Sequence, residues 1–204
     1  MAAGLTIEAL AGAFDPAQDL TDLVKTYRRR PVFTAGPSTT RVALGRRDLE
    51  CLLPHRDPFL LVDGIDAVDL EQAAIAGHRR IDPQDPVLAG HFPGDPVYPG
   101  VLLVEAIGQL GICLQHLLAT GRTAPDPGEQ PRRLRLLKVH HALFQGGVRP
   151  GESLTLLARS LDQSDYVSIC IGQVLRGEEV QALAVFEVIL LDPELDPELD
   201  QDPA

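Results

Sequence analysis

The sequence contains no tryptophan and one methionine, and aromatic residues make up only 4% of its 204 residues. Positive charge is also scarce, because 18 Lys and Arg stand against 29 Asp and Glu, a formal net charge of −11. Non-specific nucleic-acid binding needs a basic stripe, so we exclude that class of function. The first residues lack a basic stretch and carry Glu8 within an apolar run, unlike a secretory signal. We therefore expect a cytoplasmic protein.

Cysteine is equally sparse. Cys51, Cys113 and Cys170 lie far apart, each beside apolar residues, which predicts reduced, buried thiols and argues against disulfides or a metal site. Hydrophobic residues make up 45% of the chain and charged residues 23%, as in soluble globular domains. The length suits one domain with appendages and a substantial core.

The chain is organised around residues 90–119, GHFPGDPVYPGVLLVEAIGQLGICLQHLLA. A loop constrained by Pro93, Pro96 and Pro99 is followed by a run whose apolar residues cover every side of a helix, and a helix of that kind is buried. The run approaches membrane-spanning length. It contains Glu105 and Gln109 and is not flanked by a cluster of basic residues, so we expect a core helix and no membrane insertion.

Glu105 is the only formal charge in this helix, and His91 lies in the loop before it. A carboxyl group in apolar surroundings either finds a partner or has its pKa raised by desolvation. A histidine close to such a carboxyl provides the two separated pKa values that acid–base catalysis uses. Two alternatives remain open: Glu105 is solvated, or His91 is a structural hydrogen-bonding residue.

The remaining pattern predicts one short helix after Asp15-Pro16, ending near Pro31, a second over residues 47–53, and about six strands. The predicted strands cover residues 59–68, 72–81, 132–144, 152–161, 166–176 and 180–191. An antiparallel sheet that buries one face against one long helix is an α+β fold.

The run GHFPGDPVYPGVLLVEAIGQ, with LLPHRDPFLLVD before it and VRPGESLTL after it, closely resembles the hotdog-fold 3-hydroxyacyl-[acyl-carrier-protein] dehydratases. The resemblance covers roughly residues 41–191 and implies an antiparallel sheet of about six strands wrapped around one long buried helix. We therefore expect an N-terminal extension with a short helix and a linker (residues 1–40), a hotdog dehydratase-like domain (41–191) and an acidic, disordered tail (192–204).

The resemblance implies dehydration of a 3-hydroxyacyl thioester to the trans-2-enoyl thioester, with His91 as the base and Glu105 as the acid. The N–H groups of Gly100 and Val101, at the positive end of the helix, are the expected donors to the developing oxyanion. Gln109 either orients the Glu105 carboxyl or satisfies nearby backbone groups. Three loop residues either line the acyl tunnel or simply pack the loop: Phe92, Val97 and Tyr98.

By the same resemblance the substrate is carried on the phosphopantetheine arm of an acyl carrier protein, and the enzyme needs no metal or other cofactor. A homodimer is the minimum functional unit; a trimer of dimers and a heterodimer remain open, as does coenzyme A in place of the carrier. Non-catalytic hotdog acyl-binding subunits and hotdog thioesterases are the alternative functions. For His55 and Arg56 we expect a structural role.

The chain departs from the family at Gln145, Gly146 and Gly147, where the family usually has basic residues before its V-x-P-G turn. This departure weakens the expected docking surface for an acidic carrier. A basic triplet at residues 28–30 either meets an acidic carrier protein or is a solvated helix end. Five further basic residues are open to the same two interpretations: Arg132, Arg133, Arg135, Lys138 and Arg149. The N-terminal extension and the acidic tail are also unlike a minimal family member, and together these departures hint at polyketide or polyene assembly in place of primary fatty-acid synthesis.

Overall fold

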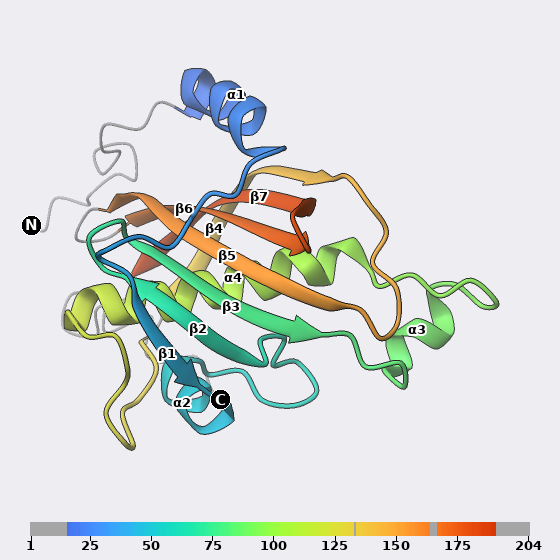
Figure 1. Cartoon of the computed structure of the whole chain (residues 1–204), viewed down its shortest axis with the longest axis horizontal. Coiled ribbons are helices and arrows are strands. Elements are labelled where there is room, and N and C mark those ends of the chain that lie inside the picture. The colour runs from blue at the N-terminus through green and yellow to red at the C-terminus, as the bar shows by residue number, and fades with distance from the viewer. Residues whose placement is uncertain (1–15, 133, 164–166, 191–204) are drawn as a thin grey trace, which may run out of the picture.

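The computed structural model describes residues 16–132, 134–163 and 167–190. Its helices and strands follow the chain in the order shown in Figure 1: α1 (Pro16–Tyr27), β1 (Thr40–Leu44), α2 (Arg46–Leu52), β2 (Gly64–Asp69), β3 (Ala74–Arg80), α3 (Pro86–Gly90), α4 (Gly100–Thr120), β4 (Leu134–Phe144), β5 (Ser153–Gln163), β6 (Val167–Arg176) and β7 (Glu179–Leu190). The predicted tail at 192–204, the proposed helix cap Asp15 and the basic residue Arg133 lie outside the described residues.

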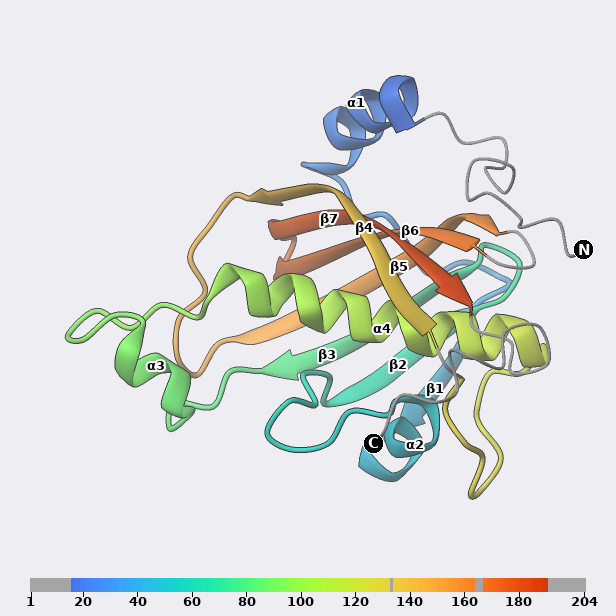
Figure 2. The same cartoon turned by 180° about the vertical axis from the view of Figure 1, so that it is seen from behind.

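The strands form one antiparallel sheet in the order β1-β2-β3-β5-β6-β7-β4, and α4 lies along one face of it (Figure 2). Inward-facing residues of the sheet and the buried residues of α4 share one hydrophobic core. Gly172 on β6 allows α4 to approach the sheet closely, because a Cβ atom at this position would lie 2.9 Å from Cβ of Ile107 on α4. The α+β hotdog arrangement expected from the sequence is confirmed.

Two strands differ from the prediction. β1 was not foreseen, and the strand predicted for residues 59–68 begins only at Gly64. The earlier part of that segment bonds to a side chain instead of a neighbouring strand. Gln109 accepts a hydrogen bond from the Leu61 N–H (2.8 Å) and donates one to the Phe59 carbonyl (2.8 Å). An apolar run does not reveal which partner satisfies its backbone, so the two cases look alike in the sequence.

Helix α4 is less completely buried than its composition predicts. Its middle and end are buried, while Val101 in the first turn is 70% exposed. The helix is long and apolar enough to cross a membrane, but most of it packs inside the fold, as expected for a core helix. The three cysteines are free; Cys113 and Cys170 are buried, whereas Cys51 is only partly buried.

The opposite face of the sheet is covered by the segment that follows α1. Val32 and Phe33 are buried there in a second hydrophobic cluster, against which Leu20, Val24 and Tyr27 also pack. One fully buried side chain, Gln173 on β6, fastens the segment through its backbone: it accepts from the Val32 N–H (2.7 Å) and donates to the carbonyls of Arg30 (2.8 Å) and Tyr27. The first described residues are therefore integrated into the fold.

Asp69 is the second anchor of this segment. Its buried carboxylate accepts hydrogen bonds from Ser38 and Thr39 (both 2.8 Å) and from the backbone and side-chain nitrogens of Gln72 (2.9 and 2.8 Å). Burial alone would raise the pKa of Asp69, but these hydrogen bonds outweigh burial and lower the pKa to about 2.

Replacing Asp69 with asparagine is expected to destabilise the protein near neutral pH. A carboxyl with a depressed pKa in the folded state stabilises the fold above its unfolded pKa and loses this contribution as the pH falls through the folded value. The difference in free energy of unfolding between wild type and variant should thus be largest near pH 7 and shrink below about pH 4, measured by urea denaturation at each pH. A difference that is independent of pH would show that the charge of Asp69 contributes nothing.

Candidate active site

His91 lies directly after α3, at the start of the proline-rich loop that leads to α4. Two hydrogen bonds close the loop upon itself. The Val97 N–H donates to the His91 carbonyl (2.8 Å), and the His91 ring nitrogen Nδ1 lies 2.8 Å from the Val97 carbonyl oxygen. The ring is therefore held by the same residue that fixes the loop.

The second of these bonds determines the tautomer of His91. A carbonyl oxygen can only accept a hydrogen bond, so Nδ1 must carry the proton. In a neutral imidazole the other nitrogen, Nε2, then has a free lone pair, which is the state of a general base. From the sequence, Val97 was expected either to line the acyl tunnel or to pack the loop; in the structure its backbone carbonyl also holds the His91 ring.

Glu105 lies one turn into α4 and is not fully buried, since 34% of its side chain is exposed in the single chain. Its Oε1 accepts a hydrogen bond from Nε2 of Gln109 (2.9 Å). Gln109 is itself fully buried and bonded to the backbone of Phe59 and Leu61. Both roles considered for Gln109 are thus present: it contacts the Glu105 carboxyl and satisfies backbone groups nearby.

His55, for which the sequence predicts a structural role, also lies beside Glu105. Its Nε2 lies 3.6 Å from Oε1 of Glu105, and only 22% of its side chain is exposed. Burial lowers the pKa of His55; the charge of Glu105 opposes the shift, and that of Arg56 adds to it. The ring is accordingly neutral near pH 7. Its position before Pro58 in the LLPHRDPFLLVD motif was the available signal.

Arg56, in contrast, fits the structural role that was predicted. Its guanidinium donates to the carbonyls of Leu53 (2.7 Å), His55 (2.8 Å) and Glu50 (3.2 Å). These bonds join the end of α2 to the segment that carries His55. Arg56 therefore shapes the backbone beside Glu105.

The N-terminus of α4 offers free donors, as predicted. Within the described residues, no hydrogen bond takes up the N–H of Gly100 or Val101, and the first turn of the helix contains no acidic residue. Both groups lie at the positive end of the helix dipole. Gly100 does allow a close approach, but the approaching group is a protein side chain: a Cβ there would lie 2.8 Å from the ring of Phe144.

The two aromatic residues of the loop have different surroundings. Tyr98 is buried in the hydrophobic core, with its hydroxyl 3.3 Å from the Arg79 guanidinium, which fits the packing interpretation. Phe92 is 57% exposed, and its ring stacks on that of His91 at 4.1 Å between centroids.

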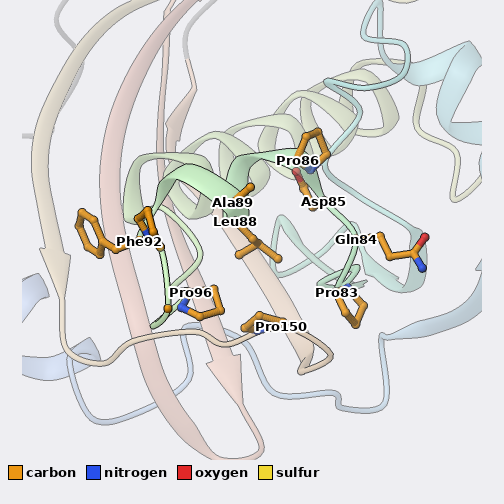
Figure 3. Close-up of a pocket in the computed structure, with 11 residues that line it drawn as sticks. Pro83, Gln84, Asp85, Pro86, Leu88, Ala89, Phe92, Pro96 and Pro150 are labelled. Atoms are coloured by element: carbon orange, nitrogen blue, oxygen red, sulfur yellow. The ribbon is translucent and has the colours of Figure 1, made fainter.

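A cavity of about 320 Å³ lies between α3 and this loop (Figure 3). Its walls are rich in proline and are formed by residues 83–86, 88, 89, 92–94, 96 and 150. Phe92 and Pro96 form part of the wall, while His91 and Glu105 do not. The cavity therefore adjoins the loop and does not enclose the pair of titratable groups.

Within one chain, His91 and Glu105 belong to separate clusters. The His91 ring contacts Val97 and Phe92, whereas the Glu105 carboxyl contacts Gln109 and His55. No group of three or more His, Cys, Asp or Glu side chains that could hold a metal ion occurs within residues 16–132, 134–163 and 167–190. The candidate base and the candidate acid therefore lie in different clusters of one chain.

Replacing His55 with alanine is expected to lower kcat roughly ten- to a hundredfold, because loss of the contact would displace the candidate acid Glu105 from its position. His55→Gln, which keeps a polar group near Oε1 of Glu105, should retain more activity than His55→Ala. Steady-state kinetics, with thermal unfolding as a control, separates a role of His55 in positioning Glu105 from a purely structural role. Unchanged kcat with lower thermal stability would show that His55 is only structural.

The chain is similar to several known proteins. The model of the FabA-like domain family matches residues 53–182. The 3-hydroxyacyl-[acyl-carrier-protein] dehydratase FabZ of Chlamydia trachomatis (serovar L2) is 35% identical over 153 residues, covering 74% of this chain and 95% of that protein. The FabZ of Chlamydia abortus is 37% identical, covering 72% and 94%. Among solved structures, the dehydratase heterocomplex ApeI:P from Xenorhabdus doucetiae matches with a TM-score of 0.56 and 16% identity, covering 75% of this chain and 96% of that one.

Proposed function

The chain belongs to the FabA-like family of 3-hydroxyacyl-[acyl-carrier-protein] dehydratases, and we propose that His91 and Glu105 carry its dehydration chemistry. The reaction converts a 3-hydroxyacyl thioester to the trans-2-enoyl thioester in fatty-acid biosynthesis. The observation that carries the assignment of residues is the His91–Val97 hydrogen bond, which leaves Nε2 of His91 free to accept a proton.

In the proposed reaction, Nε2 of His91 removes a proton from Cα of the substrate. The electron pair of that C–H bond becomes the second bond between Cα and Cβ, and the Cβ–O bond breaks. Glu105 gives its proton to the departing hydroxyl, which leaves as water. The proton on His91 then returns to Glu105, directly or through solvent, so that atoms and charges balance.

The supporting groups have distinct tasks in this proposal. The free N–H groups of Gly100 and Val101 stabilise the negative charge that develops on the thioester carbonyl oxygen. In other enzymes, each such donor lowers the activation free energy by about 3–4 kcal/mol. Gln109 and His55 orient the Glu105 carboxyl through Oε1, which leaves Oε2 to face the substrate. Phe92 and Val97 form part of the wall along the acyl chain, and Tyr98 supports that wall from the core.

We further propose that two chains assemble so that His91 of one meets Glu105 of the other. Supporting this, strand β4 lies at the edge of the sheet and exposes apolar side chains at Leu136, Leu137, Val139 and Phe144. An exposed apolar edge strand favours pairing with another copy. Phe144 also touches the start of α4, so a partner on this edge would come close to Glu105.

The substrate is proposed to arrive on the phosphopantetheine arm of an acyl carrier protein, and the enzyme itself needs no metal or organic cofactor. Residues 41–191 form the catalytic unit in this proposal, and residues 192–204 an acidic tail that takes no part in the chemistry. The curated relatives at 35% and 37% identity are dehydratases, which favours this function over a non-catalytic hotdog subunit or a hotdog thioesterase.

The test is incubation of the purified protein with a 3-hydroxyacyl-carrier thioester, followed by mass spectrometry of the acyl-carrier. Loss of one water molecule and formation of the trans-2-enoyl product are expected. Release of a free carboxylic acid would identify a thioesterase instead. Turnover only after addition of a second, different subunit would identify a heterodimeric enzyme.

A further inference from the structure

Three consecutive arginines, Arg28, Arg29 and Arg30, are exposed immediately after α1. Other exposed cations nearby are paired, as Lys25 is with Asp22. Across the part of the chain that the structure describes, no carboxylate forms an ion pair with any of the three guanidinium groups. Their charge is therefore available to a partner.

The segment that carries these arginines is held rigidly by its backbone. Gln173 bonds to backbone groups on both sides of the triplet, and Nε2 of Gln145 donates to the Arg28 carbonyl (2.6 Å). Because every one of these bonds uses main-chain atoms, the side chains of the triplet contribute nothing to the anchoring. The fold thus fixes the position of the arginines and leaves their charges in solvent.

Gln145 links the triplet to the active-site loop. It opens the connection between β4 and β5, which passes beside the loop of His91: the Tyr98 N–H donates to the Val148 carbonyl (2.8 Å), and a Cβ at Gly147 would lie 3.5 Å from the Val97 side chain. In Figure 1 the chain just after α1 lies beside the end of β4, where this connection starts. The connection between β4 and β5 therefore contacts the triplet at one end and the His91 loop further along.

The charges of that connection cancel one another. Arg149 forms an ion pair with Asp95, and Arg176 is paired with Glu152 (3.1 Å) and Glu179 (3.6 Å). At the β6–β7 turn Glu178 is also exposed. Near the β4–β5 connection, the arginine triplet consequently supplies positive charge that no carboxylate of the described residues neutralises.

We infer that Arg28, Arg29 and Arg30 form the docking surface for the acidic carrier protein that delivers the thioester, an inference that rests on the proposed function. An anionic membrane is a poorer occupant, because the apolar residues Leu20 and Val24 of α1 pack against the sheet and cannot insert into lipid. Nucleic acid is a poorer one too, since three cations on a chain of net charge −11 make no basic stripe.

The test compares a variant carrying Arg28→Gln, Arg29→Gln and Arg30→Gln with wild type on two substrates. With the carrier-bound 3-hydroxyacyl thioester, KM should rise about tenfold and lose most of its salt dependence. Exposed charges at an interface act mainly on the rate at which the two proteins associate, and salt screens this effect. With the N-acetylcysteamine thioester, which has no carrier, kcat/KM should not change. A matched variant carrying Arg41→Gln, Arg47→Gln and Arg80→Gln removes three exposed charges elsewhere and should behave as wild type.

A direct binding titration of acyl-carrier onto the Glu105→Gln protein makes the result independent of turnover. Weaker carrier binding upon neutralisation of the triplet, with unchanged thermal stability, would support the inference even if no product formed. Equal carrier affinity with and without the triplet would overturn it. So would triplet-dependent binding to anionic lipid vesicles or duplex DNA without any effect on the carrier. Absence of turnover on both substrates would count against the proposed function alone.

Discussion

Replacing His91 with alanine is expected to lower kcat about 10²- to 10⁴-fold, the usual contribution of a general base. In the proposed reaction Nε2 of His91 accepts the Cα proton, since Nδ1 is committed to the Val97 carbonyl. The measurement is the rate of enoyl-thioester formation from a 3-hydroxyacyl-carrier substrate.

His91→Asn is the more informative variant. An asparagine amide can donate a hydrogen bond to the Val97 carbonyl in place of Nδ1, but it has no basic nitrogen. Both variants should therefore be nearly inactive, and His91→Asn should also keep the wild-type thermal stability. As a control, His78→Ala removes an exposed histidine that pairs with Asp66 and should not affect turnover. Substantial activity in His91→Asn would show that His91 only holds the loop.

Replacing Glu105 with glutamine is the second change with a large expected effect, also about 10²- to 10⁴-fold in kcat. Glutamine has nearly the same shape, and its carbonyl oxygen can still accept the hydrogen bond from Gln109. It cannot give a proton to the departing hydroxyl, so the Cβ–O bond no longer breaks with assistance. Steady-state turnover and the reverse hydration of the enoyl thioester should be lost together.

The control for this variant is Glu50→Gln, which removes an exposed carboxylate that pairs with Arg46. Exposed ion pairs contribute little, so neither stability nor turnover should change measurably. If Glu105→Gln kept wild-type kcat, the proton would have to come from another group, and the role of Glu105 would be limited to packing at the start of α4.

The central helix, the preceding loop and most strands could be predicted from the sequence because each leaves a local signal. The helix shows an apolar run after Pro99-Gly100, and the loop shows regularly spaced prolines. Strand β1 and the true start of β2 left no such signal. The backbone of Phe59 and Leu61 is satisfied by Gln109, fifty and forty-eight residues away in the chain, and this kind of contact is not encoded in a periodicity.

The candidate site shows the same limit. His91 and Glu105 could be identified because their residue types and motif spacing are informative, and Gln109 because it lies one helical turn from Glu105. The motif LLPHRDPFLLVD singles out His55, but the contact of His55 with Glu105 could not be predicted, since it depends on how the segment after α2 folds back onto α4. The exposure of Glu105 was also underestimated, because composition shows that a helix is apolar but not which part of it the sheet covers.

The proposed mechanism requires a base from one chain and an acid from another to act on the same substrate. The direct measurement is turnover by a mixture of the two inactive variants, His91→Ala and Glu105→Gln, after they are unfolded and refolded together. If the site spans two chains, each mixed dimer holds one intact site, and random pairing in equal amounts should restore about a quarter of wild-type activity. If the mixture remains as inactive as either variant alone, although mixed dimers are present, His91 and Glu105 do not act together across chains.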